Sequence, residues 1–166
     1  MLVIGIDPGT ANTGFGLIRQ TPDGRLVMVD FGVIKTPSNE PMPNRLSQLH
    51  RDLSDLLGFH KPDSGAVEKL FFQRNVKTAI SVGQARGVAI LALAQAGVEI
   101  EEYTPGEIKQ AVVGYGGAEK VQVQAMVGAL LEMETVPRPD DAADALAVAI
   151  CHLHSCLLQT RLKEAL

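Results

Sequence analysis

Four acidic residues occupy positions from which their carboxylates could act together. They are Asp7, Glu68, Asp141 and Asp144. Removing a carboxylate from water costs several kcal/mol unless a cation or hydrogen-bond donors compensate it, so four converging carboxylates without matching cations would repel one another. Hard oxygen ligands select Mg²⁺ or Mn²⁺. Two such ions about 4 Å apart stabilise both the attacking and the leaving oxygen of a phosphoryl displacement, so the set predicts phosphodiester hydrolysis.

Each acid taken alone has a simpler explanation. Asp7 precedes a proline and a glycine and could cap a turn. A pair of acids at the start of a helix commonly matches the helix dipole. Asp140 follows a proline and is a natural N-cap, so we assign the cap to Asp140 and the site to Asp141 and Asp144, which share one helical face. Only the four acids together favour a metal site.

The apolar periodicity predicts the elements that must position these acids. The expected strands cover residues 2–6, 14–18, 26–34, 64–68 and 98–103. The expected helices cover residues 46–58, 78–96, 105–113 and 118–133, with a last helix after "VPRPD". The turn "TPDGR" is a hairpin signal, and Thr104 begins a capping box. This order predicts an α/β fold: a five-stranded mixed sheet, three antiparallel strands followed by two parallel ones, with helices on both faces.

Asp7 and Glu68 both lie at the carboxyl end of an expected strand. In open α/β sheets, ligands bind at that edge. If the two strands are neighbours, the two carboxylates converge. Pro8 and Gly9 would then turn the chain sharply and leave the carboxylate of Asp7 at the rim.

The composition restricts the class of protein. The chain has 166 residues, 46% of them hydrophobic and 20% charged, which fits a single domain over 1–166. Residues 1–6 lack the basic flank of a signal peptide, and the apolar stretch 79–96 is interrupted by polar residues, so no membrane partner is expected. Cys151 and Cys156 are poorly spaced for a disulfide, which favours the cytoplasm, and "CHLHSC" lacks the four ligands of structural zinc.

The charge distribution favours a nucleic-acid partner although the net charge of −4 does not. The window between Glu68 and Glu99 contains no acid. Its basic residues are Lys69, Arg74, Lys77 and Arg86. A basic stretch on an otherwise acidic protein is a candidate phosphate-binding surface.

The stretches "GIDPGT", "VEKLFFQRN", "GQARGVA", "QAVVG", "AEKVQVQ" and "DAADALAVA", in this order, resemble the RuvC Holliday-junction resolvases of bacteria. The resemblance covers nearly the whole chain. It implies an RNase H-like fold, a homodimer, paired nicking of four-way DNA junctions in recombinational repair, and cooperation with a branch-migration motor. It also implies that four carboxylates hold two metal ions per subunit, and these fall on Asp7, Glu68, Asp141 and Asp144. The apolar helix 78–96 is a candidate for the dimer interface.

The resemblance also places residues that contact DNA. The aromatic residue that stacks on bases falls on Phe71, while Phe72 could face the core, since neighbours in an extended segment point opposite ways. Stacking on an unpaired base contributes about 1–3 kcal/mol. Family lysines that contact phosphate fall on Lys109 and Lys120, although both could simply be solvated helix lysines.

The loop after Glu68 adds further candidates for phosphate contacts, namely Arg74, Asn75 and Lys77. Arg86, in the apolar helix, could instead pair internally. Some relatives carry a basic extension beyond the stretch "CLLQTRLKEAL", where this chain ends. Whether this protein makes the DNA contact of such an extension is left open.

Three other functions fit parts of the pattern. An actin-like ATPase or sugar kinase also opens with an Asp-x-Gly turn, but it needs a second domain and a second glycine-rich phosphate loop. A non-catalytic junction-binding module would not need all four acids. A nuclease for RNA/DNA hybrids would use the same metal chemistry, and only the loop residues and the dimer spacing favour the junction.

Overall fold

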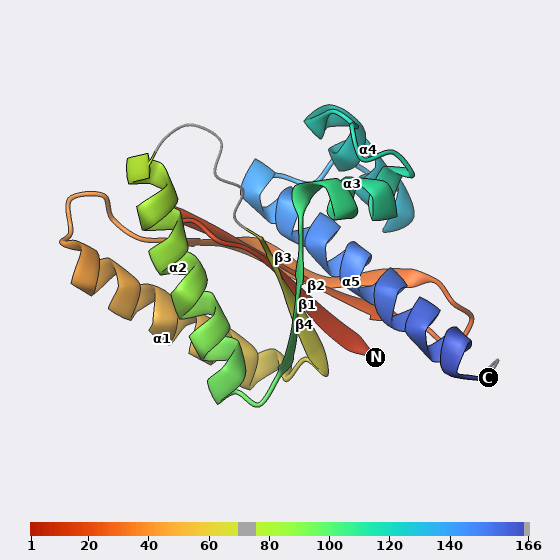
Figure 1. The fold of residues 1–166 in the computed structure, drawn as a ribbon, viewed down its shortest axis with the longest axis horizontal. Helices are drawn as coiled ribbons and strands as arrows, with labels where there is room; N and C mark the ends of the chain where they lie inside the picture. The colour runs from red at the N-terminus through yellow and green to blue at the C-terminus, as the bar shows by residue number, and fades with distance from the viewer. Residues whose placement is uncertain (70–75, 165–166) are drawn as a thin grey trace.

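The computed structural model describes residues 1–69 and 76–164 (Figure 1). Within them, the strands are β1 (Leu2–Asp7), β2 (Asn12–Gln20), β3 (Leu26–Lys35), β4 (Ser64–Glu68) and β5 (Glu99–Tyr103). The helices are α1 (Met42–His60), α2 (Val76–Gln95), α3 (Pro105–Val113), α4 (Lys120–Leu130) and α5 (Asp140–Glu164). The strands form one sheet in the order β3-β2-β1-β4-β5.

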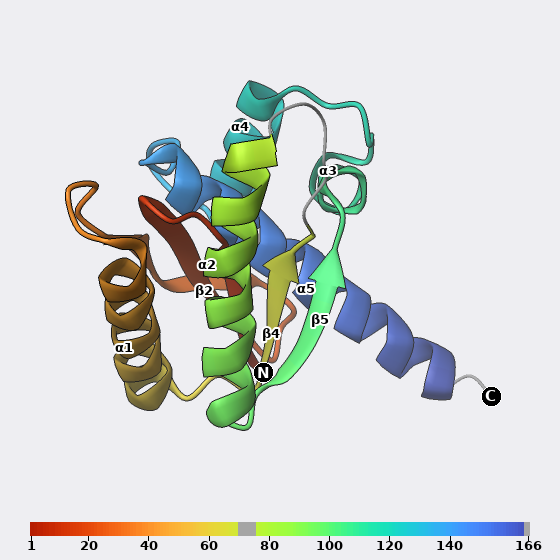
Figure 2. The same cartoon turned by 60° about the vertical axis from the view of Figure 1, so that its left-hand side comes forward.

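The pairing of the strands confirms the predicted mixed sheet. β1 pairs antiparallel with β2, and β2 pairs antiparallel with β3. β1 pairs parallel with β4, and β4 pairs parallel with β5. Figures 1 and 2 show α1 and α2 on one face of this sheet and α5, with α3 and α4, on the other.

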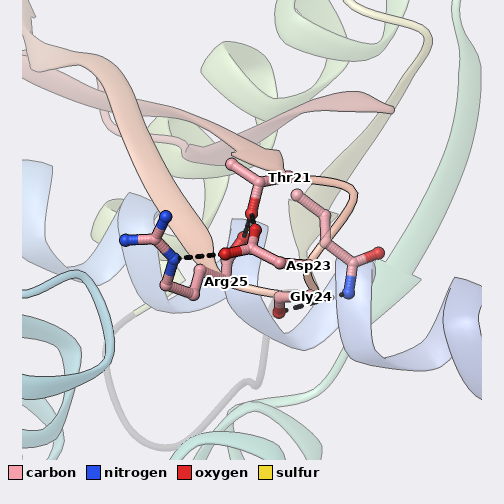
Figure 3. A network of polar contacts seen from close by, with 5 residues as sticks. Thr21, Asp23, Gly24 and Arg25 are labelled. Atoms are coloured by element: carbon pink, nitrogen blue, oxygen red, sulfur yellow. Dashed lines mark hydrogen bonds and ion pairs between the residues drawn. The ribbon is translucent and has the colours of Figure 1, made fainter.

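The hairpin between β2 and β3 forms at the predicted turn (Figure 3). Gly24 has a φ of 88°, in the left-handed region that favours glycine, and its N–H donates to the carbonyl of Thr21 at 2.9 Å. Asp23 accepts a hydrogen bond from Nε of Arg25 at 2.7 Å. The hydroxyl of Thr21 donates to the carboxylate of Asp23 as well. These contacts fix the turn and therefore the register of the antiparallel strands.

Two hydrophobic layers hold the helices on the sheet, and β1 contributes to both because alternate residues of a strand face opposite sides. One layer, between the sheet and the α1/α2 pair, includes Ile4, Ile6, Leu17, Leu53 and Leu93. The other, between the sheet and α5, includes Val3, Ile18, Leu146, Ile150 and Leu153. β1 is therefore covered on both faces, which explains its continuous apolar sequence.

α5 approaches the sheet so closely that its backbone touches the strands. A Cβ atom at Gly5 would overlap the backbone of Ala145 and Ala149, and one at Gly14 would overlap the carbonyl oxygen of Asp141. Glycine at these positions on β1 and β2 is therefore required by the contact itself. Because residue 141 begins the face of α5 that lies on the sheet, the first turn of α5 is fixed against β2.

The apolar character of α5 is explained by this packing. By length and composition, Asp140–Gln159 could cross a membrane, but 61% of this window is buried inside the fold. Its buried residues include Leu146, Ile150 and Leu153 of the second hydrophobic layer. α5 is thus the central helix of the core.

Two helix ends differ from the expectation. α1 does not end near Gly58 but continues to His60, because Lys61 adopts the left-handed conformation (φ 48°) and its N–H donates to the carbonyl of Leu57 at 2.9 Å. α4 covers Lys120–Leu130 rather than 118–133, since Glu119 forms a capping box with Gln122.

The predicted N-cap role of Asp140 is wrong. The N–H groups of Ala142 and Ala143 both donate to the carbonyl of Pro139 at 3.1 Å, so the cap position belongs to Pro139 and Asp140 is the first helical residue. The side chain of Asp140 is therefore free of the cap and available for other contacts.

Gly14→Ala is expected to lower the free energy of unfolding by about 1–3 kcal/mol, because the added methyl group forces α5 away from β2. Urea unfolding would measure this loss. Gly58→Ala is the matched control: Gly58 is exposed within α1 and a Cβ there meets nothing within 4 Å, so this change should stabilise the protein by about 0.5–1 kcal/mol. Equal effects of the two changes would contradict the close approach of α5.

Candidate active site

The first pair of acids lies where β1 and β4 end side by side. Ile6 is paired with Val67 in the parallel register, so Asp7 and Glu68 follow at the same edge of the sheet. Both side chains are partly buried. The prediction that these two strands are neighbours and bring the two carboxylates together is confirmed.

The electrostatic state of this pair shows a surplus of negative charge. Burial and the charge of Glu68 raise the pKa of Asp7 to about 8, and the charges of Asp144 and Asp141 add to the shift. Burial also raises the pKa of Glu68, although the hydrogen bond with Asp7 and the charges of two lysines oppose the shift. Without a bound cation, burial and mutual repulsion therefore disfavour the ionised form of both carboxyl groups.

The second pair of acids comes from the first turn of α5. Gly14 lies opposite Asp7 in the antiparallel register and touches the backbone of Asp141, which places the start of α5 beside Asp7. Asp144 is one turn along the same helix. Burial raises the pKa of Asp144 even though Nζ of Lys120 lies 2.8 Å from its Oδ2 atom.

Two lysines border the site, as the sequence predicted. Lys109 on α3 and Lys120 on α4 line a cleft of about 240 Å³ together with Glu68 and Asp144. The charges of both lysines act on Glu68. The cleft is therefore lined by both carboxylates and ammonium groups, an arrangement suited to a phosphate group with its cations.

The donor set fits divalent cations. Within residues 1–69 and 76–164, no three Asp, Glu, His or Cys side chains are placed so that they could together hold a metal ion as they stand. Asp7 and Glu68 face each other, while Asp144 is held by Lys120. Carboxylates whose pKa is raised by burial and mutual repulsion gain from a bound cation, and oxygen donors suit Mg²⁺ or Mn²⁺.

Other predicted contact residues are placed differently. Phe71, Phe72, Arg74 and Asn75 lie outside the described residues, and Lys77 belongs to α2 but its side chain is not described. Among the basic residues that are described, Arg86 forms an ion pair with Glu102 of β5. Arg86 thus pairs internally, as the alternative interpretation held.

The turn after Asp7 depends on a residue that the sequence analysis missed. Thr13 is fully buried, and its hydroxyl donates to the carbonyl of Gly9 at 2.6 Å. A Cβ at Gly9 would overlap the carbonyl oxygen of Asn12, so close packing rather than an unusual φ requires glycine there. Threonine is common in strands for packing reasons, so its identity alone gave no signal of this role.

The residues of "CHLHSC" serve the core. His152 is buried and hydrogen-bonds to Ser64 Oγ at 2.9 Å and to the hydroxyl of Tyr103 at 3.1 Å. Cys151 and Cys156 form no disulfide. This cluster links α5 to the start of β4 and the end of β5, so it belongs to the frame of the sheet.

Comparison with known proteins gives a consistent result. Residues 3–152 match the protein family described as crossover junction endodeoxyribonuclease RuvC. A curated relative with that description, from Syntrophomonas wolfei, is 56% identical over 99% of this chain and 95% of its own length. The structure of Thermus thermophilus RuvC superposes with a TM-score of 0.89 at 36% identity, covering 96% of this chain and 98% of that one.

A second solved structure shows T. thermophilus RuvC in complex with a Holliday junction substrate. It superposes with a TM-score of 0.87 at 33% identity and covers 95% of this chain and 96% of that one. The predicted RNase H-like fold is thereby confirmed.

Asp7→Asn is expected to stabilise the metal-free protein in a pH-dependent way. The pKa of Asp7 is about 8 in the folded state and about 3.9 in an unfolded chain. A raised folded pKa contributes stability that is present at low pH and lost as the pH rises through about 8. The asparagine variant avoids this loss, so its melting temperature should exceed that of the wild type by about 2–8 °C at the alkaline end, which corresponds to about 1–2 kcal/mol.

Thermal unfolding in a chelator between pH 5 and pH 8.5 would measure this difference. The control is Asp55→Asn, which removes an exposed acid of α1. A difference between Asp7→Asn and the wild type that does not grow with pH would contradict the charge surplus at Asp7.

Proposed function

The chain belongs to the RuvC family of crossover junction endodeoxyribonucleases, and we propose that it resolves four-way DNA junctions by symmetric paired nicks in recombination and repair. The observation that carries this proposal is the meeting of Asp7 and Glu68 at the ends of neighbouring parallel strands, beside the acidic first turn of α5. The relative that was solved with a Holliday junction substrate supports the choice of DNA substrate.

We propose that the four acids hold Mg²⁺ or Mn²⁺, with two ions per subunit. Asp7, Glu68, Asp141 and Asp144 would supply the carboxylate oxygens that hold these ions. When bound, such ions stabilise the charge that develops on the attacking and leaving oxygens of the phosphodiester. The raised pKa values of Asp7, Glu68 and Asp144 support this assignment, because burial penalises their ionised forms and the neighbouring lysines do not fully offset it.

The chain's own basic groups would hold the DNA. Lys109 and Lys120 line the cleft together with Glu68 and Asp144 and are suited to phosphate oxygens. We retain the proposal that Phe71 stacks on a base at the crossover, with Phe72 beside it. Arg74, Asn75 and Lys77 would contact phosphates along the same segment. These roles rest on the resemblance.

We further propose a homodimer that forms through α2. One face of α2 packs on the sheet with Ala85, Ala89 and Leu93, whereas Ile80 and Leu91 are 60% and 49% exposed. Two apolar side chains left open on a predominantly apolar helix favour a second copy as the partner. A two-fold dimer would present two sites at a fixed spacing, which paired cutting of symmetric strands requires.

The remaining proposals concern context. We propose a single nuclease domain over residues 1–166 and a cytoplasmic location, as the composition and the cysteine spacing predict. Cooperation with a branch-migration motor complex follows from the resemblance. The family match does not favour the two alternative functions, a nuclease acting on RNA/DNA hybrids and a non-catalytic junction-binding module. The same cleavage experiment distinguishes all three.

Cleavage of a mobile four-way junction is expected to depend on Mg²⁺ or Mn²⁺ and to fall on the order of 100-fold or more in Asp7→Asn. Junction binding should persist, since phosphate contacts rather than the acids hold the DNA. Gel analysis of nick positions on the junction, a duplex and an RNA/DNA hybrid would measure this, with Asp55→Asn as the matched control. Cleavage of the hybrid alone would favour the other nuclease, and binding without cleavage in either metal would favour the binding module.

Leu91→Glu is expected to convert the dimer into a monomer at micromolar concentration, because it places a charge on the exposed apolar face of α2. Light scattering coupled to size-exclusion chromatography would measure the mass. Leu158→Glu is the control, since Leu158 is also exposed, at 61%, but lies on α5. A wild-type protein that is itself monomeric, or a dimer lost only in the control, would contradict the proposed interface.

A further inference from the structure

Lys120 bridges two acids of α5, and only one of them belongs to the proposed metal-binding set. Its Nζ atom lies 2.8 Å from Oδ2 of Asp144 and 3.5 Å from Oδ2 of Asp140. The two acids are four residues apart, so they lie on one helical face within reach of a single ammonium group. Asp140 is half-exposed at the outer edge of the site, whereas Asp144 is more buried.

The contact with Asp144 places Lys120 in competition with a metal ion. Lys120 occupies Oδ2 of Asp144, so a metal ion that binds this oxygen would displace the ammonium group. In the part of the chain that the structure describes, no three metal donors are grouped so that they could hold an ion.

Asp140 is anchored so that one oxygen is available to Lys120. Its Oδ1 atom faces Nη1 of Arg138 at 3.7 Å, while Oδ2 faces Lys120. An ammonium group released by Asp144 therefore has a second carboxylate oxygen already within 3.5 Å.

We propose that Asp140 is a positioning residue that takes over Lys120 when Asp144 binds a metal ion. Lys120 serves as the counter-ion of Asp144 in the metal-free protein. On metal binding it moves to Asp140 and stays at the mouth of the cleft, where a DNA phosphate would lie. This inference rests on the proposed function, since it assumes that Asp144 is a metal ligand.

A merely structural role for Asp140 predicts a different behaviour. An acid in the first turn of a helix interacts favourably with the helix dipole whatever its other neighbours are. Removing this acid would then have the same effect on metal affinity in the presence and in the absence of Lys120. The same would hold for its effect on stability. If Lys120 instead moves from Asp144 to Asp140, the effect of removing Asp140 on metal affinity must depend on whether Lys120 is present.

The test is a double-mutant cycle on Mn²⁺ affinity, measured by calorimetry without DNA at 0.15 M salt. The variants are Asp140→Asn, Lys120→Met and the double variant. Lys120→Met should bind Mn²⁺ roughly 2- to 5-fold more tightly than the wild type, because a competing cation is removed. Asp140→Asn should bind it roughly 2- to 5-fold more weakly, because Lys120 then remains on Asp144.

In the Lys120→Met background, Asp140→Asn should change Mn²⁺ affinity at least twofold less than in the wild type. Asp140→Glu should restore most of the affinity, since it retains an acceptor. Arg138→Met is the matched control, because it removes a cation that faces Asp140 from the other side. It should not strengthen Mn²⁺ binding as Lys120→Met does.

Equal effects of Asp140→Asn in the two backgrounds would overturn the inference, as would a Lys120→Met variant that binds Mn²⁺ no more tightly than the wild type. Cleavage by the same wild-type preparation separates this failure from failure of the proposed function. If the wild type cleaves with metal but the effects of Asp140→Asn and Lys120→Met on Mn²⁺ affinity are independent, the nuclease assignment stands. Only the proposed movement of Lys120 to Asp140 is then rejected. A wild type that neither binds Mn²⁺ nor cleaves rejects both.

Discussion

The close approach of α5 to the sheet is the constraint on which the rest of the structure depends. Gly5 and Gly14 remove the side chains that would separate the helix from β1 and β2. The contact buries the apolar face of α5 in the centre of the protein and at the same time sets its first turn beside Asp7. Core packing and site assembly are therefore one interaction, and a change that loosens the first displaces the second.

Packing of the surrounding residues holds the acidic side chains of the site together although their negative charges repel one another. Asp7, Glu68 and Asp144 are all partly buried, and burial raises the pKa of each. Lys120 compensates Asp144 directly, and Lys109 acts on Glu68 across the cleft. Keeping the carboxylates close together therefore lowers the free energy of unfolding of the metal-free protein. A bound divalent cation would neutralise their repulsion and raise the free energy of unfolding again.

Much of this arrangement could be predicted from the sequence, because local signals and periodicity carried it. The end of β1 at Asp7, the end of β4 at Glu68 and the turn at Gly24 all followed from residue types within a few positions. The pairing of β1 with β4 needed only the assumption that the two strands are neighbours.

What escaped prediction depends on contacts between residues far apart in the sequence. The hydroxyl of Thr13 donates to the turn after Asp7 only once β2 is in place. The missing side chain at Gly14 matters only once α5 packs on β2. The N-cap was assigned to Asp140 from its residue type, but Pro139 occupies the N-cap position, and the side chain of Asp140 reaches Lys120 on another helix. No local pattern encodes a contact of that kind.

The continuity of α5 limits how the site can adjust to its substrate. Asp141 and Asp144 belong to one uninterrupted helix that runs from the site through the core, so the distance between their backbones is set by the helical rise of about 1.5 Å per residue. Asp7 and Glu68 are equally tied by the ladder between their strands. Ions or phosphates of different size must therefore be accommodated by side-chain rotations and by movement of Lys120. The backbone of the site stays fixed, and only the side-chain ends adjust.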